Sequence, residues 1–437
     1  MSGKTDFLNP SNYELKEFII TNALGDEVDI EPLILGFSLT SNLYVSSMLL
    51  NAAVYDATSF WRDFKLNGQE KVKLTFKTKR AKDVGVYHES DIELTFYIVK
   101  IENFSKRDED SASVTYDLVG IEEHIFRSKL SNISKSASGE ISEIIKDILV
   151  TDLSVNEENL NFSTSLQTAY RGVLPWRTPL KHCDFLRKRL VSKQKCPAFL
   201  FSSIVEDIPK ITLKSLTELK SADLYDRYIW AKEYSFERYS DLDYREQQIR
   251  ILDLNSKLGF SRFAQASNGA FSSNNNFFDL IDGSLRAENF DYLEDGLIEN
   301  QILEEPSIFQ NTDFPLNKFV NAHRRFEIVN SAQNSTKRFV ESDNYLKLTE
   351  KNLHHLRSQH ELLSSTRHDF RLFGDINMQP GNIIELNFPT TGELRSKDNE
   401  IIDTRLSGNY LVTGTVHNFA HDKYFVHVKA QREANPS

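Results

Sequence analysis

Four histidines lie close together in this sequence: His354, His355, His360 and His368. Imidazole binds metal ions and changes its charge near neutral pH, so such a group suggests either a metal site or a pH-sensitive switch. A metal pair on a helix needs a spacing of four residues, which puts both ligands on one face. The three histidines of the predicted helix are one, five and six residues apart. The simplest interpretation is therefore a solvated helix surface.

His360-Glu361 begins like the zinc-protease motif H-E-x-x-H, but the fifth position is Ser364, so the second ligand is missing. The 63 acidic residues could supply a glycosidase pair, which needs two carboxylates about 5–10 Å apart. No cleft signature accompanies any such pair. The phosphate-binding loop, the dinucleotide fingerprint and the nucleophile elbow are also missing. We therefore predict no catalytic, cofactor or metal site, and a hydrolase remains the alternative.

The only two cysteines, Cys183 and Cys196, lie 13 positions apart. Further ligands at close spacing, which a metal site requires, do not accompany them. We predict two reduced, partly buried thiols, because cytosolic proteins rarely form disulfides.

Charge and hydropathy exclude two further classes of protein. The net charge of −11 makes nucleic acid a poor candidate ligand, because nucleic acids are bound mainly through neutralisation of their phosphates. No run approaches the roughly 18 apolar residues of a membrane span. The polar start of the chain carries no signal-peptide core, so we expect folding in the cytoplasm of the cell that makes the protein.

Strand patterns fill the first quarter of the chain. After a short lead at 1–12, which we predict to be flexible, alternation of apolar and polar residues is clearest where Val72, Leu74 and Phe76 alternate with lysines and threonines. Similar runs recur around 92–98 and 114–118. The regular turn spacing predicts a first antiparallel β module over 13–125.

A small α/β module is predicted over 126–231. Ser138 is a candidate cap for a helix whose isoleucines recur at helical spacing from Ile141. Thr178-Pro179 begins a second helix, which Pro197 would end. Strands are expected at 199–201 and 211–213.

Two features of this module have a structural and a functional interpretation. Pro175 and Trp176 precede the second helix, and Trp176 is interpreted as a buried anchor at a module junction or as an interface hot spot. Six basic residues between 181 and 195 are interpreted as a solvated helix face or as a contact with an acidic neighbour. They are Lys181, Arg187, Lys188, Arg189, Lys193 and Lys195.

A second β module is predicted from two segments, 232–262 and 346–437, with Gln248 to Leu254 as the best strand of the first and a helix at 346–363 opening the second. Residues 259–278 are rich in Ser, Asn and Gly and predict a loop. Residues 263–345 are interpreted as an insertion or extended arm with little core, because the carboxylates within 283–313 face a single basic residue, Arg286. These carboxylates are Glu288, Asp291, Glu294, Asp295, Glu299, Glu304, Glu305 and Asp313.

The stretch from Gly374 to Phe388 predicts two strands joined by a tight turn. Pro380 presets φ near −65° and Gly381 accepts a positive φ, which is the signature of a type II turn. Alternation on both sides of the turn predicts half-buried strands. Pro175, Trp176, Gly374, Pro380 and Gly381 are thus the structural positions that we single out.

Four ordered segments resemble the central baseplate hub protein of T-even-like contractile-tailed phages, within the superfamily of tail-tube-like and type VI spike proteins. They are LNGQEKVKLTFKT (66–78), YDLVGIEEHIFRSKL (116–130) with the predicted helix after it, YRGVLPWRTPLKHCDFLRKRL (170–190), and GDINMQPGNIIELNF (374–388) with YLVTGTVHNFAHDKYFVHVKAQRE (410–433). Their order and spacing agree over most of the chain, except at 255–345, which departs from the family pattern.

The resemblance implies a mainly β fold with α+β parts: two tail-tube-like antiparallel β-barrels plus two smaller inserted domains. It implies a homotrimer whose six barrels form a pseudo-sixfold ring between the hexameric tail tube and a trimeric spike. Implied partners are the spike protein, tube or tube-initiator proteins, wedge or tape-measure proteins, and DNA only in transit. The implied place is the tail baseplate of a virion, without membrane insertion by this chain.

Two alternatives stay open. One is a component of a type VI secretion or related spike complex, and the other is a tail-associated cell-wall hydrolase.

Overall fold

A computed structural model describes residues 10–83, 86–106, 113–163, 168–190, 196–230, 243–258, 262–280, 283–295, 318, 323–329, 342–389, 402–403, 406–420 and 423–433. Residues 1–9 of the predicted lead lie outside these ranges. So do four acidic positions of the predicted arm, Glu299, Glu304, Glu305 and Asp313, and two of the basic positions, Lys193 and Lys195.

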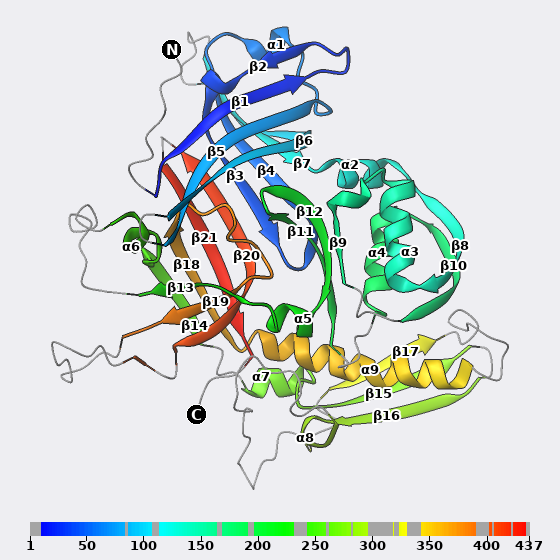
Figure 1. The fold of residues 1–437 in the computed structure, drawn as a ribbon. Coiled ribbons are helices and arrows are strands. Elements are labelled where there is room, and N and C mark those ends of the chain that lie inside the picture. Colours follow the sequence, from blue (N-terminus) through cyan, green and yellow to red (C-terminus); the bar gives the residue numbers. More distant parts are fainter. Residues whose placement is uncertain are drawn as a thin grey trace.

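The main element is a curled sheet of 13 strands (Figure 1). The first seven strands are β1 (Tyr13–Thr21), β2 (Glu27–Asp29), β3 (Ile34–Asn42), β4 (Val45–Asp56), β5 (Lys71–Asp83), β6 (Val86–Lys106) and β7 (Val114–Ile121). The last six are β13 (Leu224–Ile229), β14 (Asp253–Leu258), β18 (Thr366–Phe373), β19 (Ile383–Asn387), β20 (Gly408–Ala420) and β21 (Lys423–Arg432). The mainly β fold with α+β parts is thus confirmed.

The two predicted β modules are two halves of this one sheet. Its strand order is β14-β18-β21-β20-β3-β4-β7-β6-β5-β1-β2, and β13 joins it through β19, which pairs with β20. The halves meet where β20 pairs with β3, from Gly414 opposite Asn42 to Ala420 opposite Gly36. Because β13 belongs to the sheet, the strand pairing extends the second half into residues that the sequence assigned to the α/β module.

One hydrophobic core lies inside the curled sheet and draws side chains from both halves. Phe37 of β3 stacks on Phe419 of β20 with their ring centroids 4.4 Å apart, and Phe76 of β5 lies edge-on to Phe419 at 5.0 Å. The alternation predicted for β5 is present, since Val72, Leu74 and Phe76 are fully buried. A short helix, α1 (Phe60–Asp63), lies at the end of the first half.

The α/β module packs beside the first half of the sheet (Figure 1). Its helices are α2 (Glu123–Leu130), α3 (Ile141–Asp147), α4 (Pro179–Arg187) and α5 (Leu216–Lys220). Its strands form a pair, β8 (Ile133–Glu140) with β10 (Ala169–Arg177), and a three-stranded sheet of β9 (Leu160–Phe162), β11 (Ala198–Val205) and β12 (Ile208–Ser215). Its own core includes Ile145, Leu174, Cys183 and Leu186.

The two helices predicted in this module exist, with different boundaries. Ser138 lies in strand β8, paired with Arg171 of β10, and α3 begins three residues later after Glu140. Pairing with β10 therefore overrides the capping preference of serine. Pro179 does occupy the first helical position of α4, but the helix ends at Arg187 and not at Pro197. The backbone then forms tighter turns, in which the N–H groups of Arg189 and Leu190 donate to carbonyls three residues earlier.

The predicted acidic arm contains a folded unit with its own core. Strands β15 (Ser272–Asp279), β16 (Leu285–Asp291) and β17 (Arg324–Val329) form a sheet beside α7 (Arg262–Ser267), α8 (Tyr292–Asp295) and α9 (Ser342–Leu363). The core consists of Ala266, Ala270, Phe271, Phe290, Tyr292 and Leu362. The expectation of a loop at 259–278 is therefore wrong for the described residues 262–278, and the expectation of an arm with little core is wrong as well. The polar composition of this segment predicted an exposed loop, but polar residues such as Ser272 and Ser273 are buried under neighbouring elements.

Two strand predictions in the second half need correction. Gln248 ends a helix, α6 (Tyr244–Gln248), and the strand begins only at Asp253. The Asp243 carboxylate accepts hydrogen bonds from the backbone N–H groups of Arg245 and Glu246, so a capped helix turn forms there. Strand β18 ends at Phe373, because the next residues fold into turns in which Asp375 accepts a hydrogen bond from the backbone of Asn377.

Candidate functional site

Gly374 and Gly381 each satisfy a local packing requirement. A Cβ on Gly374 would lie 1.9 Å from Cδ1 of Tyr424, so only glycine fits beside that ring. Gly381 has φ of +95°, and the N–H of Asn382 donates to the carbonyl of Gln379 across Pro380-Gly381, as in a type II turn. The turn also holds the α/β module, since a Cβ on Gly381 would meet the Phe201 ring at 3.1 Å.

Pro175 and Trp176 lie on the surface. Trp176 is 70% exposed near the end of β10, and its strand neighbour Pro175 is exposed as well. The predicted buried anchor is therefore wrong. The strand pairing shifts register between Leu174 and Arg177, so the chain departs from regular alternation at the tryptophan and keeps it out of the core. The interpretation of Trp176 as an interface residue stays a prediction.

His354, His355 and His368 are buried, so the predicted solvated helix surface is wrong for His354 and His355, whereas His360 is exposed as predicted. His354 Nδ1 lies 2.6 Å from Ser273 Oγ, and its ring stacks on Phe290. His368 lies on β18 between Ser256 and Tyr410, with its ring nitrogens 2.7 Å and 3.0 Å from their oxygens. Within the described residues, no group of three or more His, Cys, Asp or Glu side chains is placed to hold a metal ion.

The two cysteines are fully buried and form no disulfide, as predicted. They are more deeply buried than the sequence suggested. Burial raises the pKa of the Cys183 thiol to about 12, so it stays protonated at neutral pH.

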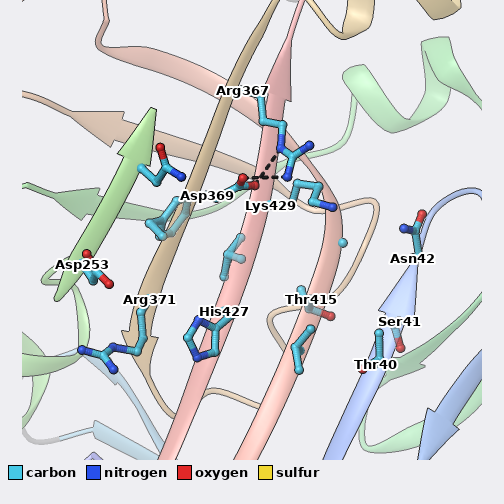
Figure 2. A pocket seen from close by; sticks show the side chains of 15 residues that line it. Thr40, Ser41, Asn42, Asp253, Arg367, Asp369, Arg371, Thr415, His427 and Lys429 are labelled. Atoms are coloured by element: carbon cyan, nitrogen blue, oxygen red, sulfur yellow. Dashed lines mark hydrogen bonds and ion pairs between the residues drawn. The ribbon is translucent and has the colours of Figure 1, made fainter. Parts of the chain in front are cut away.

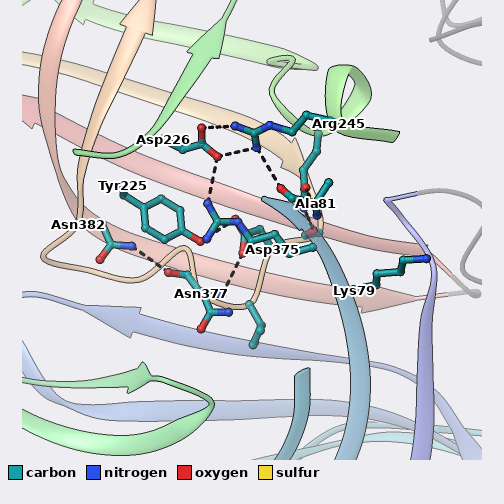
Figure 3. A network of polar contacts seen from close by, with 12 residues as sticks. Lys79, Ala81, Tyr225, Asp226, Arg245, Asp375, Asn377 and Asn382 are labelled. Atoms are coloured by element: carbon teal, nitrogen blue, oxygen red, sulfur yellow. Dashed lines mark hydrogen bonds and ion pairs between the residues drawn. The ribbon is translucent and has the colours of Figure 1, made fainter. Parts of the chain in front are cut away.

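A buried polar network, which we call the clasp, joins the two halves of the sheet (Figure 3). Arg80 of β5 lies between two carboxylates, with Nη2 3.1 Å from Asp226 of β13 and Nε 3.3 Å from Asp375. Arg245 of α6 also binds Asp226, at 2.7 Å and 2.5 Å. Tyr225 donates its hydroxyl to Asp375 at 2.8 Å, and its ring lies under the Arg80 guanidinium.

Charges in the clasp are mutually compensated. Burial raises the pKa of Asp375, and the charge of Arg80 opposes that rise. The hydrogen bond with Asp226 raises the pKa of Arg245. Paired and hydrogen-bonded in this way, the clasp serves to hold β5, β13 and α6 together. No local motif in the sequence predicts the clasp, because its members are separated by up to 295 positions.

A shallow hollow of about 350 Å³ lies on the sheet where β14, β18, β21, β20 and β3 run side by side (Figure 2). Strand register aligns two rows of residues across it. One row is Asp253, Arg371, His427, Val416 and Thr40, and the other is Asn255, Asp369, Lys429, Gly414 and Asn42.

The middle of the second row is open because Gly414 carries no side chain. Arg367 closes one side through a two-pronged ion pair with Asp369, at 2.8 Å and 2.6 Å. Burial lowers the pKa of His427, and the neighbouring charge of Arg371 lowers it further, so the ring is neutral at physiological pH. Charged side chains of both signs and apolar side chains thus line the hollow together.

None of the described helices has the length and apolarity needed to cross a membrane.

Comparison with known proteins shows a shared fold without detectable sequence relatives. No protein-family model and no curated protein matches the chain by sequence. Among solved structures, the tail protein from Neisseria meningitidis MC58 superposes with a TM-score of 0.53 and 10% identity over 97% of both chains. The fold of this chain is therefore the fold of that tail protein, which is a conclusion about architecture alone.

Two further solved structures resemble the chain more weakly. The 43 kDa tail protein of prophage MuSo2 from Shewanella oneidensis has a TM-score of 0.49 and 9% identity, covering 96% of this chain and 100% of that one. A type VI secretion component from E. coli, itself described as similar to tail proteins of T4 bacteriophage, has a TM-score of 0.45 and 8% identity, covering 92% and 76%.

Proposed function

We propose that this chain is a structural hub subunit of a contractile phage tail, which assembles as a homotrimer and joins the hexameric tail tube to a trimeric central spike. The observation that carries the proposal is the fold likeness to a tail protein across 97% of both chains. The four ordered segments noted in the sequence agree with it. We propose no enzymatic activity, cofactor or metal.

The architecture of the sheet supports an adaptor role. Each chain carries two β halves joined edge to edge between β20 and β3, so three chains would present six β units around one axis. Within the described part of the chain, β14 and β2 each pair with a single strand, which leaves their outer edges available for neighbours. A threefold assembly with sixfold local repetition resolves the mismatch between a hexameric tube and a trimeric spike.

The proposed setting follows from this role. The partners are the spike protein, tube or tube-initiator proteins, and wedge or tape-measure proteins, in the baseplate of a virion assembled in the host cytoplasm. DNA would pass through the ring without specific binding, consistent with the net charge of −11.

The test is the solution mass of the purified full chain by light scattering coupled to size exclusion, followed by imaging of the particles. We expect about three times the 50.4 kDa chain mass and rings with pseudo-sixfold symmetry. A monomer both alone and with the spike encoded beside it would overturn the hub proposal.

Two further results separate the alternatives. Lysis of purified peptidoglycan that one carboxylate substitution abolishes would establish the hydrolase instead. A gene neighbourhood of type VI secretion components, without tail genes, would establish the secretion-spike alternative.

A further inference from the structure

The surface around Trp176 combines apolar and basic side chains. We call it the basic island and define it as Lys129, Leu130, Arg171, Val173, Trp176 and Arg177. Leu130, Val173 and Trp176 are 75%, 59% and 70% exposed. The three basic side chains are exposed too, and none of them forms an ion pair within the described part of the chain.

Contacts in the α/β module place these residues together. Arg171, Val173, Trp176 and Arg177 follow one another along β10, where three residues span about 10 Å. The backbone N–H of Leu180 donates to Ser128 Oγ, which puts the end of α2, with Lys129 and Leu130, beside the end of β10. The opposite side of β10 is anchored by buried Tyr170 and Leu174, so the island rests on a fixed support.

The island thus places an exposed tryptophan near two arginines that form no ion pair with any described residue, in a chain whose net charge is −11. Tryptophan and arginine are the residues most enriched at the energetic centres of protein interfaces. The sign of the local charge indicates an acidic partner.

The same chain carries an acidic counterpart, which we call the acidic edge: Leu24, Asp26, Glu27, Val28, Asp29 and Glu31. No basic residue occurs between Thr21 and Gly36. Leu24 is 88% exposed at the tip of the turn that leads into β2. β2 pairs with β1 alone and ends the strand order, and none of the four carboxylates forms an ion pair within the described residues.

The acidic edge and the basic island lie on different sides of the molecule, at β2 and at β8–β10 (Figure 1). A contact between them within one chain is not present, since both surfaces are exposed. Between two chains, such a contact would join two different surfaces head to tail. Repetition of a head-to-tail contact forms a closed ring when the rotation from one copy to the next divides the full circle evenly.

We infer that the basic island of one copy binds the acidic edge of the next copy, with Trp176 and Leu24 as apolar anchors inside a rim of opposite charges. The inference rests on the proposed homotrimer and names the surfaces that join its subunits.

The test is sedimentation velocity of the full chain over a wide concentration range. R171E/R177E reverses the island, and E27K/E31K reverses the edge. Asp29 is left intact because its carboxylate accepts the backbone N–H groups of Phe18 and Glu31. A matched control, K106E/K423E, changes the net charge of the chain as much as the island variant does, at exposed positions outside both surfaces.

We expect each reversal to weaken self-association at least about tenfold, and Trp176→Ala to weaken it similarly, while the control leaves it unchanged. The quadruple variant, with both reversals in one chain, should recover association to within about threefold of the wild type. Added salt should weaken wild-type association, because the contact is charged.

Three results would overturn the inference. A trimer that persists in both reversal variants would exclude this contact while leaving the proposed hub intact. Wild-type chain that stays monomeric at every concentration, both alone and with the spike encoded beside it, would exclude both. Binding of a single-stranded oligonucleotide that R171E/R177E abolishes, without an effect on self-association, would reassign the island to nucleic acid.

Discussion

The ring of Tyr424 leaves no room for a side chain at Gly374, and this makes the glycine a sharp test of packing. A Cβ there would overlap Tyr424 at 1.9 Å, in a loop held on both sides by buried residues. We expect Gly374→Ala to lower the free energy of unfolding by about 3 kcal/mol or more, measured by chemical denaturation. Gly414→Ala is the matched control, because its Cβ would meet neighbours no closer than 3.6 Å, and it should stay within about 1 kcal/mol of the wild type. Equal effects of the two substitutions would contradict this explanation.

Trp176 should contribute little to the stability of the isolated chain. Its side chain is 70% exposed, so Trp176→Ala removes few packed contacts. We expect a loss below about 1 kcal/mol in the same denaturation experiment, performed at a concentration where the chain is monomeric. A loss near the roughly 4 kcal/mol typical of a buried tryptophan would restore the anchor interpretation.

His368 and His417 should make stability fall in mild acid. Burial lowers the pKa of His368 to about 4, with the charge of Arg432 adding to the effect, and burial lowers the pKa of His417 to about 3. The unfolded chain takes up these protons below about pH 6.5, while the folded chain does not. Stability is therefore lost as the pH falls from about 6.5 toward 4, at roughly 1.4 kcal/mol per pH unit for each histidine.

Denaturation curves across this pH range measure the slope. Buried Asp375, whose pKa is raised, acts in the opposite direction as the pH falls through its own titration. His368→Gln keeps hydrogen-bonding capacity toward Ser256 and Tyr410 and should flatten the slope. An unchanged slope would show that His368 does not titrate differently in the two states.

At the scale of elements, the clasp decides how β5, β13 and α6 are held. Arg80 is 14% exposed and compensates two buried carboxylates, so Arg80→Met should cost about 3 kcal/mol in stability. Adding Asp375→Asn should recover part of that loss, since the uncompensated charge is then removed. Arg227→Met is the matched control: its ion pair with Glu385 is 70% exposed on the arginine side and should be worth less than about 1 kcal/mol. Similar losses at both arginines would contradict a special role for the clasp.

Some element boundaries follow from local residues, whereas others are set by tertiary contacts. The Thr178-Pro179 start of α4 and the Pro380-Gly381 turn are stereochemical, so they can be predicted from a few adjacent residues. Ser138 shows the opposite case, because hydrogen bonding to β10 recruits it into a strand although serine favours helix caps.

At the scale of the whole molecule, the two β halves should unfold together. They share one core and are joined by the β20–β3 pairing and by the clasp. With Trp176 replaced by Phe, two tryptophans remain, and both pack against the shared core. Trp61 lies in α1 and reports on the first half, whereas Trp230 directly follows β13 and reports on the second half. We expect variants that retain either Trp61 or Trp230 alone to show the same fluorescence midpoint in denaturant. Two separate midpoints would mean that the halves are independent domains.

The sequence by itself determined the strand-rich class, the surface and core faces of strands such as β5, the start of α4 and the turn at Gly381. Each of these depends on periodicity or on the stereochemistry of adjacent residues. Only the tertiary structure decided which polar side chains are buried and which large apolar side chains stay exposed. Ser272, His354 and Arg80 are covered by elements distant in the chain, whereas Trp176 remains in water. Burial and partner choice depend on which surfaces meet after folding, and no local pattern carries that information.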